Sequence, residues 1–204
     1  EGIKMSANNQ LIDTHQHLWI ISEREYSWLK PEFGVIYGDF GPELIESELG
    51  PAGVTGTVMV QSADTYADTF YMLDVAAKHK FVKGVVGWVP LNRPDEASAA
   101  LDVLVKNPIF KGVRNLIHDY PDPKWILKPE VLEGIGLLDS HNLVMDFVSV
   151  NSEHISCLPV IAEKYPNLKI VIDHISKPDI KNNGWEPWAS EMALVAKYPN
   201  IYAK

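Results

Sequence analysis

The chain has 204 residues, 46% of them hydrophobic, and a formal net charge of −9 at neutral pH. This length and apolar content suit one domain with a sizeable core, and the acidic charge argues against nucleic acid or an anionic membrane as a partner. Cys157 is the only cysteine, so the sequence offers no intrachain disulfide and no thiolate metal site.

Apolar, β-branched runs of strand length alternate with helix-like stretches along the chain. Most of these runs are continuously apolar, which is typical of parallel strands covered on both faces. The expected strands are residues 11–14, 54–60, 81–89, 110–117, 143–150, 168–172 and 201–203. The expected helices are residues 43–49, 69–79, 96–105, 131–140, 155–165 and 188–197.

This alternation predicts an α/β fold, a (β/α)8 TIM barrel truncated after about seven strands. A full barrel takes ~250 residues. We therefore expect residues 5–204 to form a single barrel domain whose C-terminal units are missing, and residues 1–4, ahead of Met5, to be a cloning remnant. No GxGxxG or Walker loop follows a strand, which argues against a nucleotide cofactor.

The expected cellular location and binding partners depend on two sequence signals that are absent. The sequence has no run of about 18 apolar residues that would span a bilayer, and no secretory signal is expected at its start. We expect a cytoplasmic protein with a small-molecule substrate, and neither nucleic acid nor membrane as a partner.

Two histidines, His15 and His17, follow the first expected strand at a spacing of two residues. Side chains two residues apart on a strand share a face, so these imidazoles are expected side by side. Two neutral imidazoles on one face form a chelating pair for zinc or a similar ion. His174 follows a later strand and is expected to join them, because barrel strands bring their carboxyl ends to one face. The alternative is a histidine pair bonded to loop carbonyls.

Four other side chains at strand ends are candidates for substrate binding. Arg114 lies where a strand should be apolar, so its burial needs an anion, either a substrate carboxylate or oxyanion or a structural ion-pair partner. His118 and Gln61 could instead be satisfied polar residues in loops, and Trp88 could floor a pocket or belong to the core or its rim.

The remaining polar candidates receive structural interpretations. Asp173 is expected to hold a neighbouring histidine in place rather than to act on substrate. His79, His141 and His154 lie on or just before expected helices and are expected to be solvated.

The chain resembles the amidohydrolase superfamily, and within it the lactonase-like branch typified by L-fuconolactonase and L-rhamnonolactonase. The matching stretches, in the family's order, are residues 12–19 (IDTHQHLW), 110–114 (FKGVR), 121–125 (PDPKW), 171–178 (VIDHISKP) and 198–204 (YPNIYAK). The resemblance implies a (β/α)8 barrel of the metal-dependent hydrolase type, whose first-strand HxH and sixth-strand histidine line the site. It also implies an aspartate at the end of strand 8 that takes a proton from the attacking water, and this sequence ends before that strand.

Two departures from the superfamily pattern argue against a two-metal centre. Strand 4 carries Arg114 and no bridging lysine, and strand 5 ends in Asn151 rather than histidine. The resemblance thus implies a hydrolase of carbohydrate metabolism that opens a sugar-acid lactone or a similar ester. Its catalytic residues His15, His17 and His174 would bind one divalent ion, zinc or similar, or act without a metal. The alternatives are a metal-dependent non-oxidative decarboxylase and a catalytically inactive truncated barrel.

Overall fold

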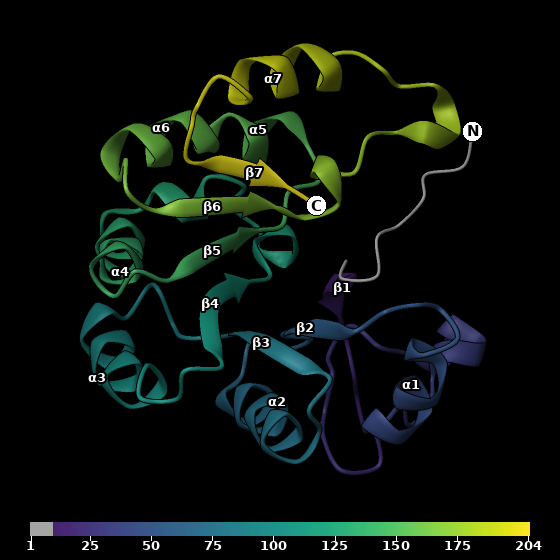
Figure 1. The fold of residues 1–204 in the computed structure, drawn as a ribbon. Coiled ribbons are helices and arrows are strands. Elements are labelled where there is room, and N and C mark those ends of the chain that lie inside the picture. Colours follow the sequence, from purple (N-terminus) through teal and green to yellow (C-terminus); the bar gives the residue numbers. More distant parts are fainter. Residues whose placement is uncertain (1–9) are drawn as a thin grey trace.

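The computed structural model describes residues 10–204 and shows seven parallel strands in one curled sheet, in the order β1 to β7 (Figure 1). The expectation about residues 1–4 lies outside this range. The strands are β1 (Ile12–Gln16), β2 (Gly56–Val60), β3 (Val82–Gly87), β4 (Phe110–Asn115), β5 (Val144–Phe147), β6 (Lys169–Ile172) and β7 (Ile201–Ala203). The predicted α/β fold of the barrel type is confirmed.

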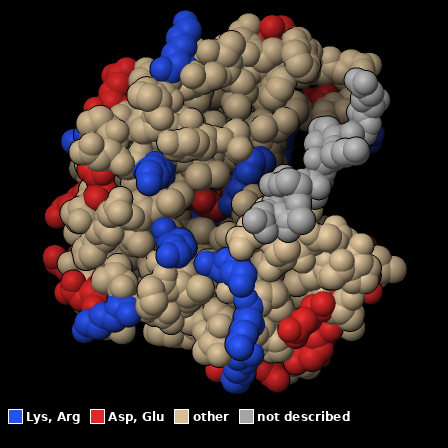
Figure 2. All heavy atoms as spheres, in the orientation of Figure 1, with Lys and Arg blue, Asp and Glu red and all other residues tan. Residues whose placement is uncertain are grey.

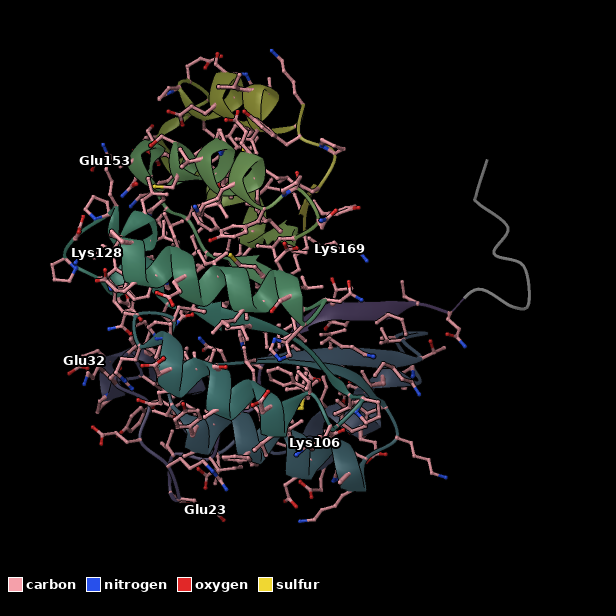
Figure 3. All side chains as sticks on the ribbon, turned by 90° about the vertical axis from the view of Figure 1, so that its left-hand side faces the viewer. Glu23, Glu32, Lys106, Lys128, Glu153 and Lys169 are labelled. Atoms are coloured by element: carbon pink, nitrogen blue, oxygen red, sulfur yellow. The ribbon has the colours of Figure 1, made fainter. Side chains whose placement is uncertain are left out.

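The helices lie on the outer side of the curled sheet, and α3 and α4 pack against one another (Figures 1 and 3). They are α1 (Pro42–Leu49), α2 (Tyr66–Lys78), α3 (Pro94–Leu104), α4 (Pro129–Ser140), α5 (Ser152–Ile155), α6 (Cys157–Lys164) and α7 (Trp188–Val195). Short 3₁₀ segments span Pro31–Ile36, Ile117–Asp119, Trp125–Leu127, Asp173–Ser176 and Ile180–Asn182. Within residues 10–204, no helix combines the length and the apolar character needed to cross a membrane.

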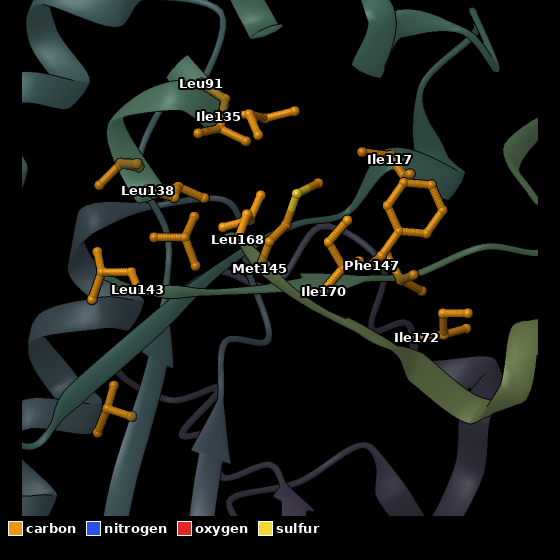
Figure 4. Packing of buried hydrophobic residues seen from close by; sticks show 14 of the residues in the cluster. Leu91, Ile117, Ile135, Leu138, Leu143, Met145, Phe147, Leu168, Ile170 and Ile172 are labelled. Atoms are coloured by element: carbon orange, nitrogen blue, oxygen red, sulfur yellow. The ribbon is translucent and has the colours of Figure 1, made fainter. Parts of the chain in front are cut away.

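The main hydrophobic core lies between the sheet and the helices. Met145 and Phe147 of β5 and Ile170 of β6 belong to one buried cluster with Ile135 and Leu138 of α4 (Figure 4). Each of these side chains is almost fully buried, and burying one contributes about 1.5–3 kcal/mol. The apolar outer faces of the strands therefore anchor the sheet to its helices.

The concave face of the sheet carries charged side chains near the strand ends. Alternation along β5 turns Asp146 away from Met145 and Phe147. Arg114 of β4 is in register with Asp146, and Asp146 with Val171 of β6, so these three share the concave face. The fold thus brings buried charges together where barrel enzymes have their active sites.

Two helix boundaries differ from the prediction because polar side chains cap the helices. The side chain of Thr65 accepts a hydrogen bond from the Asp68 amide, so α2 begins three residues before the expected start. The expected helix 155–165 is two helices, since Asn151 caps a separate turn by accepting from the His154 amide. The expected solvation of His154 is wrong: only 2% of this residue is exposed.

Candidate active site

His15 and His17 face each other at the end of β1, with their Nε2 atoms 3.0 Å apart. The Nδ1 atom of His17 lies 2.7 Å from the Val60 carbonyl oxygen. A carbonyl only accepts, so Nδ1 carries the proton and Nε2 keeps its lone pair. Burial, reinforced by the charge of Arg114, lowers the pKa of His17 to about 3. His17 is therefore neutral at physiological pH, the form that binds a metal.

Arg114 and Asp173 form an ion pair beside these imidazoles. The Arg114 Nη1 atom lies 2.9 Å from Asp173 Oδ2, and both side chains are at most 4% exposed. Arg114 Nη2 also donates to the carbonyl oxygen of Gln61. Burial opposes ionisation of Asp173, but the nearby His15 ring and the charges of Arg114 and Lys204 outweigh it and hold the pKa of this carboxyl well below its ordinary value. The anion that Arg114 requires is thus provided within the protein.

His174 completes a cluster of potential ligands. Its ring centroid lies 4.5 Å from that of His15, and one donor atom from each of His15, Asp173 and His174 lies within 4.8 Å of the others. His15 Nδ1 and Asp173 Oδ1 are buried and have no hydrogen-bond partner among residues 10–204. Imidazoles and a carboxylate are the donors that zinc prefers. Although the Arg114 guanidinium, 3.4 Å from His15 Nε2, opposes a cation, the donor set fits one divalent ion.

Lys204 and Asp146 extend the charged cluster, and neither was singled out by sequence reasoning. Lys204 Nζ lies 2.6 Å from Asp146 Oδ2 and 3.6 Å from Asp173 Oδ1. Burial, aided by the charge of Asp173, raises the pKa of Asp146 against the influence of Lys204. One signal could have found Asp146: it is the single charged residue in the apolar run 143–148 (LVMDFV).

A cavity of about 230 Å³ opens beside this cluster. Its lining combines aromatic and aliphatic side chains with polar and charged ones, and site residues form part of it. The lining residues are His17, Trp28, Ser62, Arg114, Leu116, His118, Asp119, Val148, His174 and Lys177. The charges are unevenly distributed on the face that Figure 2 shows: Lys and Arg side chains lie both near its centre and at its margins, whereas acidic side chains lie mostly toward its edge.

The three further candidates for substrate binding have different positions. His118 lines the cavity, and burial lowers its pKa. Gln61 is fully buried and does not line the cavity, and its Nε2 donates to Asp64 Oδ1 and to the Arg114 carbonyl oxygen. Trp88 packs against Tyr66, outside the lining of this cavity. Of the three, the structure brings only His118 to the cavity.

A left-handed turn follows β6 and connects two lining residues, His174 and Lys177. All four residues of the turn have φ between 45° and 61°, a region that costs a non-glycine residue about 1–3 kcal/mol. Ile175 is β-branched and is the least suited to it. Sequence reasoning missed the turn because it contains none of the glycines that usually mark positive φ.

Comparison with known proteins extends over nearly the whole chain. A family described as "Amidohydrolase" matches residues 12–204. An L-fucono-1,5-lactonase of Burkholderia ambifaria is 40% identical over 193 residues, which are 95% of this chain and 66% of the relative. An L-fucono-1,5-lactonase of Burkholderia multivorans is 22% identical, with the same two coverages. The chain thus spans just under two thirds of the length of these relatives.

Solved structures show the same fold. An amidohydrolase from Burkholderia multivorans with bound zinc has a TM-score of 0.84 at 21% identity, over 96% of this chain and 69% of that one. A 2,6-dihydroxybenzoate decarboxylase from Rhizobium has a TM-score of 0.60 at 11% identity, over 82% of this chain and 67% of that one. With a family match from the first strand to the last, the chain belongs to the amidohydrolase family.

Proposed function

We propose that the protein hydrolyses a small sugar-acid lactone in the cavity beside His15, His17 and His174. The observation that carries this proposal is the 40% identity to a relative named L-fucono-1,5-lactonase. The size of the cavity supports a small substrate, and its mixture of apolar and hydrogen-bonding walls is typical of small-molecule sites. A cytoplasmic location is part of the same proposal.

In this proposal the positively charged Arg114 side chain stabilises the lactone carbonyl oxygen during the reaction. Water attack places negative charge on the carbonyl oxygen, and a fixed positive charge beside it stabilises that charge. Arg114 lines the cavity, and its Nε–H has no partner among residues 10–204. Asp173 holds the guanidinium in place through the 2.9 Å contact.

Polar side chains in the lining of the cavity bind the hydroxyl groups of the sugar ring. Ser62, His118 and Lys177 are hydrogen-bonding residues of the lining that can serve this role. His118 has a lowered pKa and is neutral at neutral pH, so it can both donate and accept. Water adds to the acyl carbon, the ring C–O bond breaks, and a proton passes to the departing alkoxide. The family resemblance implies that an aspartate at the end of strand 8 would be the base that takes this proton from water.

His15, His17 and His174, with Asp173, would hold a divalent ion in the same site. When bound, such an ion lowers the pKa of its water from ~15.7 to near 7 and polarises a carbonyl oxygen. Zinc is the favoured ion because its ligand preferences match this donor set. The unprotonated Nε2 of His17 and the ionised Asp173 carboxylate are already in the form that binds a cation.

The test is proton release by the full-length protein from a panel of sugar 1,5-lactones, with and without a chelator. The proposal expects turnover that His15→Ala abolishes and His79→Ala leaves intact, because His79 pairs with Glu46 at the surface. Carbon dioxide release from an aromatic acid, without lactone opening, would identify a decarboxylase. Thermal stabilisation by a lactone without turnover would identify a binding protein.

A further inference from the structure

The left-handed turn His174–Lys177 is held from outside by two side chains. Ser149, in the segment after β5, donates its hydroxyl to Ser176 Oγ over 2.5 Å. Trp188 of α7 donates its Nε1–H to the Ile175 carbonyl oxygen over 2.7 Å. Inside the turn, the Lys177 amide bonds to the His174 carbonyl oxygen over 2.9 Å. Surrounding contacts must maintain four successive residues at positive φ, because the backbone alone disfavours them.

The Ser149–Ser176 contact is the buried one of the two external side-chain contacts, and one backbone bond from the Ile175 amide to the Lys204 carbonyl oxygen, 3.1 Å long, also holds the turn. Ser149 is fully buried and Ser176 is 2% exposed, whereas the bond from Trp188 lies in an exposed region. A hydroxyl pair shielded from water has no solvent to replace a lost partner. Ser176 also lies between the two residues that the turn presents to the cavity, His174 and Lys177.

We propose that Ser149 is a positioning residue: through Ser176 it fixes the left-handed turn and thereby the orientation of the His174 imidazole. Ser149 is not among the residues that line the cavity, so it acts through its partner and touches no substrate. The inference rests on the proposed function only for the turnover measurement, because that measurement requires the protein to hydrolyse a lactone. The orientation of the His174 ring is independent of the reaction.

The test compares four variants of the full-length protein: Ser149→Ala, Ser176→Ala, the double variant and the control Asn183→Gly. Asn183 also has positive φ, 55°, but lies in the exposed segment after Asp179. The first readout is the imidazole ¹H–¹⁵N spectrum of His174 with chelator present, since its ring lies 4.5 Å from the His15 ring and its shifts report their relative orientation. The second is lactone turnover, and circular dichroism checks folding.

We expect both serine variants to shift the His174 resonances and to lower kcat between about 10- and 100-fold, the effect of misplacing a reacting group. The double variant should be no worse than either single variant, because one bond is lost in each case. Asn183→Gly should change neither readout. Unchanged His174 resonances in folded Ser149→Ala would overturn the proposal, as would additive effects in the double variant. If Ser149→Ala does not fold, the His174 spectrum of Ser176→Ala tests the proposal instead, and unchanged resonances in that variant would overturn it.

Failure of the proposed function gives a different result. If the unaltered protein opens no lactone, the proposed lactone hydrolysis is wrong. The His174 spectrum would still decide whether Ser149 positions the imidazole ring.

Discussion

The Nη1 atom of Arg114 and the Oδ2 atom of Asp173 lie 2.9 Å apart, 59 residues apart in sequence and almost completely shielded from water. Removing one partner of a buried pair leaves a charge without compensation, at a cost of about 3–5 kcal/mol. We expect Arg114→Met to fall at the lower end of this range, because Lys204 remains near Asp173. Denaturant unfolding measures the change as a lower midpoint with an unchanged slope.

The matched control for this pair is the double variant Arg114→Met, Asp173→Asn, which removes both charges. It should recover much of the lost stability. A cost below about 1 kcal/mol for Arg114→Met alone would mean that solvent screens the pair.

His15 provides the test of the imidazole cluster. Its Nε2 lies 3.0 Å from that of His17, and its ring lies against that of His174, so one substitution removes the central ring of three. We expect His15→Ala to lower lactone turnover by at least ~100-fold while circular dichroism stays unchanged. Retained activity in a folded variant would contradict the assignment of the site.

Zinc should stabilise the protein through the same cluster. A ligand present at one hundred times its dissociation constant adds about 2.7 kcal/mol to the free energy of unfolding. We expect zinc to raise Tm in the unaltered protein and in His79→Ala, but not in His15→Ala. Equal stabilisation of His15→Ala would place the zinc elsewhere.

The free energy of unfolding should fall as the pH falls from about 6.5 toward 3. The pKa of His17 is about 3 in the folded protein and 6.5 ordinarily. Between these values the unfolded chain binds a proton that the folded protein does not, so acid favours unfolding. The slope of the unfolding free energy against pH measures how many protons the chain takes up when it unfolds. His17→Gln should lower that number by up to one. Asp173, whose pKa is also lowered, adds to the loss only below its ordinary value near 3.8. An unchanged slope in His17→Gln would show that His17 ionises normally.

Lys177 should contribute to substrate affinity more than to the chemical step. It lines the cavity at the end of the left-handed turn, and a hydrogen bond from a charged group contributes about 1.5–3 kcal/mol. We expect Lys177→Gln to raise KM roughly tenfold or more with little change in kcat. Lys181→Gln, four residues further along, is the control and should leave both constants unchanged. A fall in kcat at constant KM would assign Lys177 to the chemistry.

The sequence predicted the fold and part of the site for separate physical reasons. Parallel strands covered on both faces are continuously apolar, so each one is visible as a run. The HxH spacing placed two imidazoles on one side of β1, and the convergence of strand ends brought His174 to them.

The partners of Arg114 could not be predicted in the same way. Its ion pair with Asp173 depends on a register and a strand order that no local pattern encodes. The position of the His174 side chain could not be predicted from strand alternation either, because β6 ends at Ile172 and His174 belongs to the left-handed turn. The interpretation of Gln61 also depended on burial: its amide is used inside the protein and holds the backbone of Arg114.

The contact between Lys204 Nζ and the Thr14 carbonyl oxygen spans 190 residues at a distance of 3.0 Å. It joins β1 to the end of β7, and Lys204 also contacts Asp146 and Asp173. Contacts that close long loops carry the largest entropy penalty and form slowly. The charged cluster should therefore assemble late in folding, after the β2–β6 units have packed on their helices. Pulse-labelled hydrogen exchange would detect this order as late protection of the amides near Thr14 and Lys204.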